Sequence, residues 1–246
     1  MSITLLNKKY LKSEQAKRWQ MIKNVTLKLG LILLLWIFLV TGMGTSFSGA
    51  AKEDMVVGDF GVGSLIGWQE KSFKNTTRYE LVKDDLGMVL KAESNNSASG
   101  MYREIKIDLV KTPCVIWSWK VDNILDNLDE TTKSGDDYPA RLYVVFSGGL
   151  SFWRTHALNY VWSNGRPIGS AWPNAYTESS INIAVQSGLG KVGQWTQQSR
   201  NVRSDYKRFI GVDVKQADAI AIMTDTDNSG SVATAFYGDI RFSSTC

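Results

Sequence analysis

Residues 114–121 read CVIWSWKV, and this stretch decides the fold class. Apolar side chains alternate with Ser118 and Lys120, so every second residue, including Trp117 and Trp119, falls on the same face. A period of two residues is the period of a β-strand that buries one of its faces. We therefore expect a β-sheet protein with Trp117 and Trp119 in its core.

Similar runs rich in β-branched and aromatic residues recur through residues 52–246, separated by clusters of Gly, Asn, Asp and Ser. Many short runs of this kind are typical of a sandwich or a barrel. We predict a single all-β domain, a two-sheet antiparallel jelly-roll-like sandwich, with one short helix in RSDYKRFIG at residues 203–211. The other expected strands are 87–93, 100–109, 140–147, 157–163, 180–186, 219–224 and 233–242.

Residues 1–51 have a different composition and are expected to be a leader. Residues 1–50 contain seven basic side chains and one acidic one, and Leu29–Val40 reads LGLILLLWIFLV without a charge. A basic region, an apolar core and a stretch of small residues follow one another in signal peptides. We expect an apolar helix that is cleaved or kept as an inner-membrane anchor, and the start could be Met1 or Met21. Cleavage is favoured because these twelve residues fall short of the roughly 20 needed to cross a bilayer.

The net positive charge of the chain belongs to this leader. Removing its side chains from the totals of 28 basic and 24 acidic residues leaves 21 and 23, a net charge of −2 for the rest. A nucleic-acid-binding domain needs excess positive charge to displace counterions from phosphates. The charge therefore argues against nucleic-acid binding, and the leader predicts a periplasmic or otherwise extracytoplasmic location.

Cys114 and Cys246 are the two cysteines of the chain. An extracytoplasmic setting would allow them to form a disulfide, but Cys246 could equally remain loose at the end of the chain. With one histidine and two cysteines, a zinc site of the usual ligand types is not expected.

The sequence DTDNSG begins at Asp225 and matches the first half of an EF-hand calcium loop. Alternate oxygen ligands in such a loop surround a hard cation, and glycine permits the sharp turn. The twelfth position holds Phe236 in place of a bidentate carboxylate, and the loop falls between two expected strands. Calcium bound by Asp225, Asp227 and Ser229 is one reading, and a plain hairpin turn is the other.

Polar residues within the expected strands could line a groove for an extended ligand. Sugars suit such a lining, because aromatic rings cover the apolar face of the sugar while amide, guanidinium and carboxylate groups pair with its hydroxyls. Alternatively, Arg141 forms structural ion pairs with Asp136 and Asp137. The candidate ligand contacts are Arg141, Tyr143, Asn182, Gln186, Tyr237 and Arg241, with Tyr237, Asp239 and Arg241 expected on one face of the last strand.

Five motifs in order carry a family resemblance: KSGDDYPARLYVVF from Lys133, ALNYVWSN from Ala157, AVQSG from Ala184, RNVRSDYKRFIG from Arg200 and IAIMTDTDNSG from Ile220. Together they resemble the bacterial family of domain of unknown function 3047. That resemblance implies an exported, β-rich single domain and assigns no activity to it.

Two further segments, GDFGVGSLIGWQEKSF from Gly58 and AFYGDIRF from Ala235, more distantly resemble the first and last strands of jelly-roll, galactose-binding-like carbohydrate-binding modules. In many such modules an early Glu and a late Asp hold a structural calcium. Gly61 stands where the early acidic residue would be, while Asp59 and Asp239 remain.

The preferred functional hypothesis is an exported, non-catalytic binding protein that recognises a carbohydrate or another cell-envelope component. One alternative is a polysaccharide-acting enzyme. A hydrolase would need two carboxylates about 5 to 10 Å apart, for which Asp136 with Asp239 or Asp225 is the nearest candidate pair, and a lyase could use Tyr143 and Arg141. A second alternative is an envelope assembly or scaffold protein. Membrane contact is expected only through the N-terminal segment.

Overall fold

The computed structural model describes residues 54–126, 128–147 and 155–246, all of which fall in the unit Lys52–Cys246. The predicted N-terminal apolar helix lies outside these residues. Within the described ranges, no helix is both long enough and apolar enough to cross a membrane.

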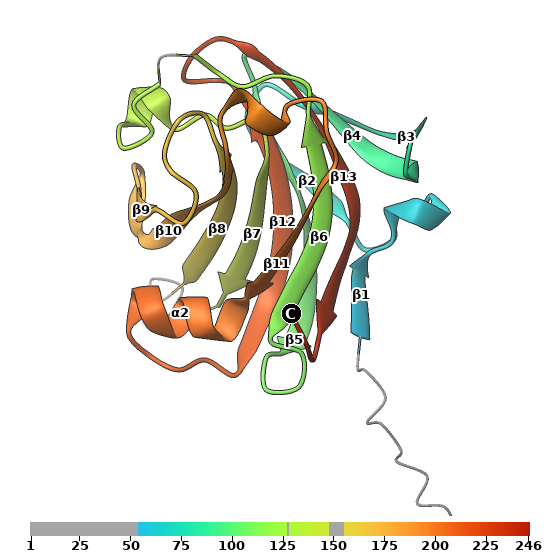
Figure 1. Cartoon of the computed structure of the whole chain (residues 1–246), viewed down its shortest axis with the longest axis vertical. Coiled ribbons are helices and arrows are strands. Elements are labelled where there is room, and N and C mark those ends of the chain that lie inside the picture. Colours follow the sequence, from blue (N-terminus) through green and yellow to red (C-terminus); the bar gives the residue numbers. More distant parts are fainter. Residues whose placement is uncertain (1–53, 127, 148–154) are drawn as a thin grey trace, which may run out of the picture. The chain divides into compact units, whose positions relative to one another are not determined.

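Two sheets face each other in this unit (Figure 1). Sheet A has the strand order β11-β6-β13-β4-β3, and β1 also pairs with β13; sheet B has the order β2-β5-β12-β7-β8-β10-β9. The strands of sheet A are β1 (Asp54–Gly58), β3 (Arg78–Asp84), β4 (Gly87–Asn95), β6 (Cys114–Val121), β11 (Thr196–Asn201) and β13 (Val232–Ser243). The strands of sheet B are β2 (Gln69–Lys74), β5 (Ala98–Asp108), β7 (Arg141–Phe146), β8 (His156–Ser163), β9 (Ala171–Asn174), β10 (Thr177–Ser187) and β12 (Gln216–Asp225).

The predicted all-β, two-sheet sandwich is therefore confirmed for the described residues. Each expected strand is present with its ends shifted by a few residues, and β6 has the predicted bounds. One pair departs from the antiparallel rule, since β8 and β10 run parallel. The chain crosses from one to the other through β9, which pairs antiparallel with β10 at the end of sheet B.

Large aromatic side chains fill the space between the sheets. Trp117 and Trp119 of β6 are buried, as the alternation predicts, and contact aromatic residues of β8 in the other sheet. The ring centres of Trp117 and Tyr160 are 5.6 Å apart, and those of Trp119 and Trp162 are 6.2 Å apart. Tilted aromatic pairs at such distances add to the free energy gained by burying the rings.

A nine-residue helix, α2 (Val202–Ile210), confirms the predicted helix and lies across one end of the sandwich (Figure 1). The Asn201 side chain accepts a hydrogen bond from the Ser204 backbone N–H at its start, and Gly211 ends it with a φ of 90°. These are favoured capping positions for Asn and Gly. The described part of the chain also contains three short 3-10 turns: η1 (Phe60–Val62), η2 (Lys133–Gly135) and η4 (Leu189–Lys191).

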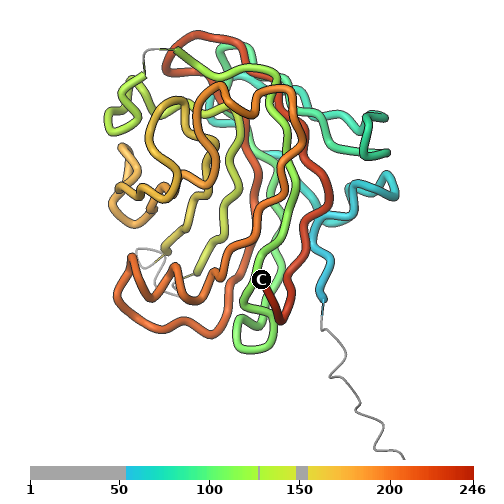
Figure 2. The backbone as a smooth tube through the Cα atoms, viewed as in Figure 1, coloured from blue at the N-terminus to red at the C-terminus, as the bar shows by residue number. Residues whose placement is uncertain are grey.

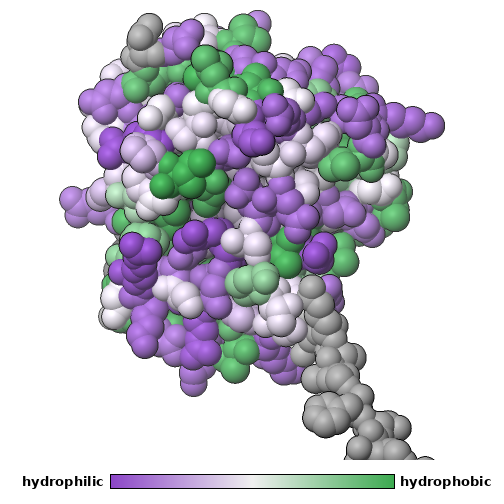
Figure 3. Space-filling view, in the orientation of Figure 1, coloured by the Kyte–Doolittle hydropathy of each residue, from purple (hydrophilic) through white to green (hydrophobic). Residues whose placement is uncertain are grey.

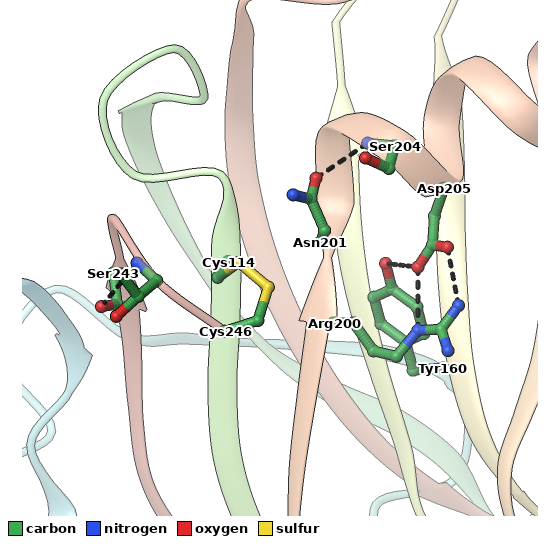
Figure 4. The surroundings of a disulfide bond; sticks show 9 residues. Cys114, Tyr160, Arg200, Asn201, Ser204, Asp205, Ser243 and Cys246 are labelled. Atoms are coloured by element: carbon green, nitrogen blue, oxygen red, sulfur yellow. Dashed lines mark hydrogen bonds and ion pairs between the residues drawn. A yellow bond between two sulfur atoms is a disulfide. The ribbon is translucent and has the colours of Figure 1, made fainter.

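The C-terminus lies beside the first residues of β6 (Figure 2). There Cys114 and Cys246 are joined by a disulfide, with their Cα atoms 5.2 Å apart (Figure 4). The last paired residue of β13, Ser243, is directly opposite Cys114. The disulfide thus holds the end of the chain against the strand that β13 already pairs with.

A half-buried ionic contact lies near the disulfide (Figure 4). Arg200 donates two hydrogen bonds to the Asp205 carboxylate, at 2.6 and 2.9 Å, and the Tyr160 hydroxyl donates a third at 2.9 Å. Burial, together with the negative charge of Asp205, raises the pKa of Tyr160. These bonds connect α2 to β11 and to β8 of sheet B.

On the surface shown in Figure 3, hydrophobic residues form small separate patches among hydrophilic ones. Isolated apolar residues of this kind are normal on protein surfaces. A scaffold protein that packs against an envelope partner would be expected to expose a large apolar patch, whereas the face in Figure 3 shows only small ones.

Candidate functional site

A pocket of about 370 Å³ lies at the β9–β10 hairpin, on the last two strands of sheet B. The hairpin residues from Trp172 to Glu178 line it, and Thr131 lies at its other side. The lining includes two aromatic rings, two threonine hydroxyls, one amide and one carboxylate. It can therefore offer both flat apolar surface and hydrogen-bonding groups to a ligand.

Tyr176 is the exposed aromatic residue of this pocket, with 56 % of its surface accessible. Its hydroxyl donates a 2.6 Å hydrogen bond to Oδ1 of Asn228, and its backbone N–H donates to Oδ1 of Asn174 at 3.0 Å. The Lys133 ammonium lies 5.3 Å from the centre of the ring. The ring is thus fixed in direction by its hydroxyl and by the turn while much of it stays open to solvent.

Trp172 forms a rigid wall of the same pocket. It is 5 % exposed, and its indole N–H donates a 3.0 Å hydrogen bond to the backbone carbonyl of Glu130. The guanidinium of Arg166 lies 4.5 Å from the centre of its ring. Its indole N–H and one face of its ring are therefore already in contact with other residues. Trp172 shapes the pocket but leaves little of its surface free for a ligand.

A buried ionic network lies directly beneath the hairpin. The Asn174 amide donates to both carboxylate oxygens of Asp136, at 2.9 and 3.0 Å. Arg141 in turn donates to the backbone carbonyl of Asp136 and, at 2.6 Å, to the carboxylate of Asp225. Arg141 is 2 % exposed and Asp225 is 3 % exposed. Burial raises the pKa of the Asp225 carboxyl well above its usual value, although the charge of Arg141 opposes that rise.

Arg141, Tyr143 and Asn182 lie on the outer face of sheet B, where Arg141 bonds to Tyr143 and Asn182 bonds to Asn159. The Arg141 guanidinium donates to the Tyr143 hydroxyl at 2.9 Å. Asn159, which is opposite Tyr143 on one side and Asn182 on the other, donates its amide N–H to Oδ1 of Asn182 at 2.7 Å. The structure thus brings three predicted contact residues to one face. Gln186 lies further along β10, where its side chain accepts from the Ser187 backbone N–H.

Tyr237 and Arg241 do not join that group. Tyr237 is buried between the sheets, where its hydroxyl donates to the Met223 carbonyl at 2.7 Å. Arg241 lies on the outer face of sheet A, with Nε 3.7 Å from the Asp54 carboxylate. The expectation that Tyr237 and Arg241 share a face is wrong, because the pairing of β13 with β6 shifts between Tyr237 and Ile240 and changes which side the later residues face.

The same end of sheet B also contains a group of acidic residues that could hold a cation. Oxygens of Asp137, Asp225 and Asp227 all lie within 4.8 Å of one another. Calcium prefers carboxylate oxygens as ligands. The predicted third ligand was Ser229, but its backbone N–H donates to the Asp137 carboxylate at 2.6 Å while its hydroxyl faces the Thr226 carbonyl. In this arrangement Asp137, and not Ser229, supplies the third ligand oxygen beside Asp225 and Asp227.

The carboxylate pairs considered for a hydrolase are also placed by the structure. Asp136 and Asp225 both contact Arg141. Asp239 lies on β13 of sheet A. Among these, none lines the β9–β10 pocket, whose described lining contains the carboxylate of Glu178.

The model of a protein family, described as protein of unknown function (DUF3047), matches residues 66–241. This match covers most of the chain. The chain belongs to the DUF3047 family. None of the curated proteins compared with it is a match.

Solved structures similar to this DUF3047 protein include carbohydrate-binding modules with low sequence identity. The family 11 module of the cellulosomal cellulase Lic26A-Cel5E of Clostridium thermocellum is 11 % identical, with a TM-score of 0.45 over 78 % of this chain and 95 % of the module. A family 29 carbohydrate-binding module is 8 % identical, with a TM-score of 0.37 over 78 % of this chain and 89 % of the module.

Sequence reasoning missed Tyr176, Trp172 and Asn174 as site residues of the DUF3047 chain. The segment AWPNAYT at residues 171–177 has no run of alternating residues long enough to predict a strand. Its signal was the combination of Pro and Asn, which favour turns, with one aromatic residue before them and one after. Aromatic rings beside a predicted turn are candidates for an exposed binding surface.

Proposed function

We propose that this protein is an exported, non-catalytic carbohydrate-binding protein and that it holds its ligand at the β9–β10 pocket. The observation that carries the proposal is the exposed ring of Tyr176, anchored through its hydroxyl to Asn228 at the edge of a 370 Å³ pocket. A ring fixed in advance loses little conformational freedom when a ligand stacks on it.

The chemistry of the pocket suits a sugar. The face of a pyranose ring carries C–H groups that pack on an aromatic ring, and its hydroxyls can both donate and accept hydrogen bonds. Beside Tyr176 the pocket offers the hydroxyls of Thr131 and Thr177 and the carboxylate of Glu178. Glu178 is exposed, so it can accept from ligand hydroxyls without first giving up a buried partner.

Arg141 supports this pocket without touching the ligand. It is buried, and it holds Asp136, which accepts both hydrogen bonds from the Asn174 amide. Asn174 in turn accepts from the backbone N–H of Tyr176. Arg141 is therefore a positioning residue that fixes the hairpin, and Tyr143 and Asn182 lie on the sheet behind it.

Export is proposed from the leader and supported by the disulfide. The first 50 residues combine basic side chains with the apolar run Leu29–Val40, and Cys114 is bonded to Cys246. Disulfides persist in oxidising compartments such as the periplasm. Alkaline phosphatase fused to the C-terminus should be active in intact cells, and a fusion that stays inactive there would rule out export.

Binding is tested by polysaccharide pull-down and glycan array with the purified protein. We expect Tyr176→Ala to weaken binding at least about tenfold, or about 1.4 kcal/mol. Tyr102→Ala is the matched control, because Tyr102 is a half-exposed tyrosine of β5 outside the pocket. The proposal fails if no glycan binds or if Tyr176→Ala binds as well as the control. Release of shortened oligosaccharides from a bound polysaccharide would contradict the non-catalytic part.

A further inference from the structure

Tyr176 is held at two separate points, its hydroxyl and its backbone. The hydroxyl donates to Oδ1 of Asn228 at 2.6 Å, and the backbone N–H donates to Oδ1 of Asn174 at 3.0 Å. The Lys133 carbonyl, at 3.5 Å, is a more distant acceptor for the same hydroxyl. Asn174 lines the β9–β10 pocket, whereas Asn228 belongs to the loop between β12 and β13 and does not line it. The end of the Tyr176 ring is therefore held from outside the pocket.

Both attachments lead to two consecutive buried carboxylates, Asp136 and Asp137. The Asn174 amide donates to both oxygens of Asp136, at 2.9 and 3.0 Å. The backbone N–H and the side-chain amide of Asn228 both donate to Oδ1 of Asp137, at 3.2 and 3.1 Å. The hairpin and the β12–β13 loop are thus tied to the same short segment of chain.

These contacts close a circuit of hydrogen bonds, which the peptide bond between the two aspartates completes. In order, it runs through Asp136, Asn174, Tyr176, Asn228 and Asp137. The ring of Tyr176 cannot turn away from the pocket while its hydroxyl stays bound to the loop. A side chain that is fixed before binding loses less conformational freedom when a ligand packs on it.

The segment that carries the two aspartates is fixed by contacts of its own. The Asn164 amide donates to the backbone carbonyl of Asp137 at 2.9 Å. On the other side, a Cβ atom at Gly135 would collide with the backbone carbonyl of Asp129, so glycine permits the tight turn just before Asp136. The circuit therefore has a rigid base, and its exposed part is the ring of Tyr176.

We propose that Asn228 is a positioning residue of the β9–β10 pocket, which orients the exposed Tyr176 ring for the ligand without touching the ligand itself. This inference rests on the proposed carbohydrate binding at that pocket. A residue that only orients the ring changes the affinity for every ligand that stacks on it by the same factor. A residue that contacts the ligand changes the affinities for different sugars by different factors.

The test is calorimetric titration of the full chain with three neutral hexasaccharides, cellohexaose, xylohexaose and mannohexaose. We expect Asn228→Ala and Tyr176→Phe each to weaken binding about two- to tenfold, the factor expected when one more side chain must be immobilised on binding. The two substitutions remove the same hydrogen bond from its opposite ends, so the double variant should bind no more weakly than the weaker single variant. Additive losses, or a loss in Tyr176→Phe alone, would overturn the proposal, because the hydroxyl would then act on the ligand directly.

Asn201→Ala is the matched control. Asn201 is also half-buried, and its Oδ1 accepts a hydrogen bond from a backbone N–H at the start of α2, outside the pocket. It should bind each hexasaccharide like the unaltered protein. Asn228→Ala keeps the backbone N–H that donates to Asp137, so the loop is retained. Equal weakening in the two variants would point to a general loss of stability and would overturn the positioning role.

Fluorine NMR of the chain labelled with 3-fluorotyrosine tests the position of the ring without a ligand. The Tyr176 signal is the one that is absent from Tyr176→Phe. In Asn228→Ala it should move towards the position of fluorotyrosine in the unfolded chain, and Asn201→Ala should leave it in place. A signal that does not move in Asn228→Ala would overturn the proposal.

Failure of the carbohydrate-binding proposal has a different signature. Tyr176→Ala would then bind glycans like the Tyr102→Ala control, or no glycan would bind at all. A fluorine signal that moves in Asn228→Ala, together with no binding of any hexasaccharide, would keep the orienting contact and reject its role in carbohydrate binding.

Discussion

Arg141 and Asp225 form a buried ion pair on neighbouring strands of sheet B, with Nη2 of Arg141 2.6 Å from Oδ2 of Asp225. Their side chains are 3 % and 4 % exposed. Neither charge can return to water if its partner is removed, since the surrounding sheet and loops stay in place. The pair therefore links the stability of the unit to the geometry of the β9–β10 pocket above it.

Arg141→Ala should lower the free energy of unfolding by about 3–5 kcal/mol, because removing one partner of a buried pair leaves the other charge uncompensated. Urea unfolding measures this loss. Arg203→Ala is the matched control, since Arg203 forms a 2.6 Å pair with Asp213 at the surface, and its loss should be far smaller. Equal losses for the two variants would show that the Arg141 pair is not buried as described.

The ionised Asp84 carboxylate should stabilise the folded unit, and this contribution should be lost in acid. The carboxylate accepts from the Lys120 ammonium and from the Trp195 indole N–H, both at 2.7 Å. Although burial alone would raise the pKa of Asp84, these hydrogen bonds lower it below its usual value. A lowered folded-state pKa gives stability that is present above the unfolded-state pKa of about 3.9 and lost as the pH falls through the folded-state value.

This pH effect is measured by comparing urea midpoints of the unaltered protein and Asp84→Asn. The variant should be less stable at pH 7, and the difference should shrink below about pH 4, where the carboxylate is protonated. A difference that stays the same from pH 7 to pH 3 would contradict the lowered pKa.

Calcium should stabilise the unit if Asp137, Asp225 and Asp227 bind it. A ligand that binds only the folded state at 100 times its Kd adds about 2.7 kcal/mol, which thermal unfolding would show as a higher Tm. Asp137→Asn should remove the effect while keeping an oxygen that can accept from the Ser229 N–H. A Tm that does not respond to calcium would favour the plain hairpin turn.

Reduction of the disulfide should destabilise the unit by about 2–4 kcal/mol, because a cross-link limits the conformations of the unfolded chain. The two cysteines are 132 residues apart, so the closed loop is long. Cys114→Ser should show the same loss without a reducing agent. Titration of two free thiols in the unreduced, unfolded protein would show that the bond is absent.

The sequence predicts the inner strands of this sandwich well and the edge strands poorly. β6 buries one face, so its alternation is visible in the sequence. β2 reads QEKSFK with every residue exposed, and β11 reads TQQSRN. These outer strands are held by backbone pairing with β5 and β6. Backbone pairing leaves no mark on the hydrophobic pattern, so propensity alone could not find them.

The candidate site was predicted less completely than the fold. The acidic loop at Asp225 and the polar face around Arg141 were both visible as motifs. The irregular pairing after Tyr237 could not be seen in the sequence, because whether a strand has a bulge depends on the strand it pairs with. That Tyr176 remains open while Trp172 is buried depends on contacts with Asn228 and Glu130, which are distant along the chain.

Pro173 lies in β9, the four-residue strand at the end of sheet B. Proline has no backbone N–H, and short edge strands that contain it are poor templates for pairing with another chain. The strand that forms one wall of the β9–β10 pocket therefore also protects the sheet from joining edge to edge with a second molecule. Lengthening this hairpin to enlarge the pocket would carry a risk of aggregation that changes at Tyr176 or Thr177 avoid.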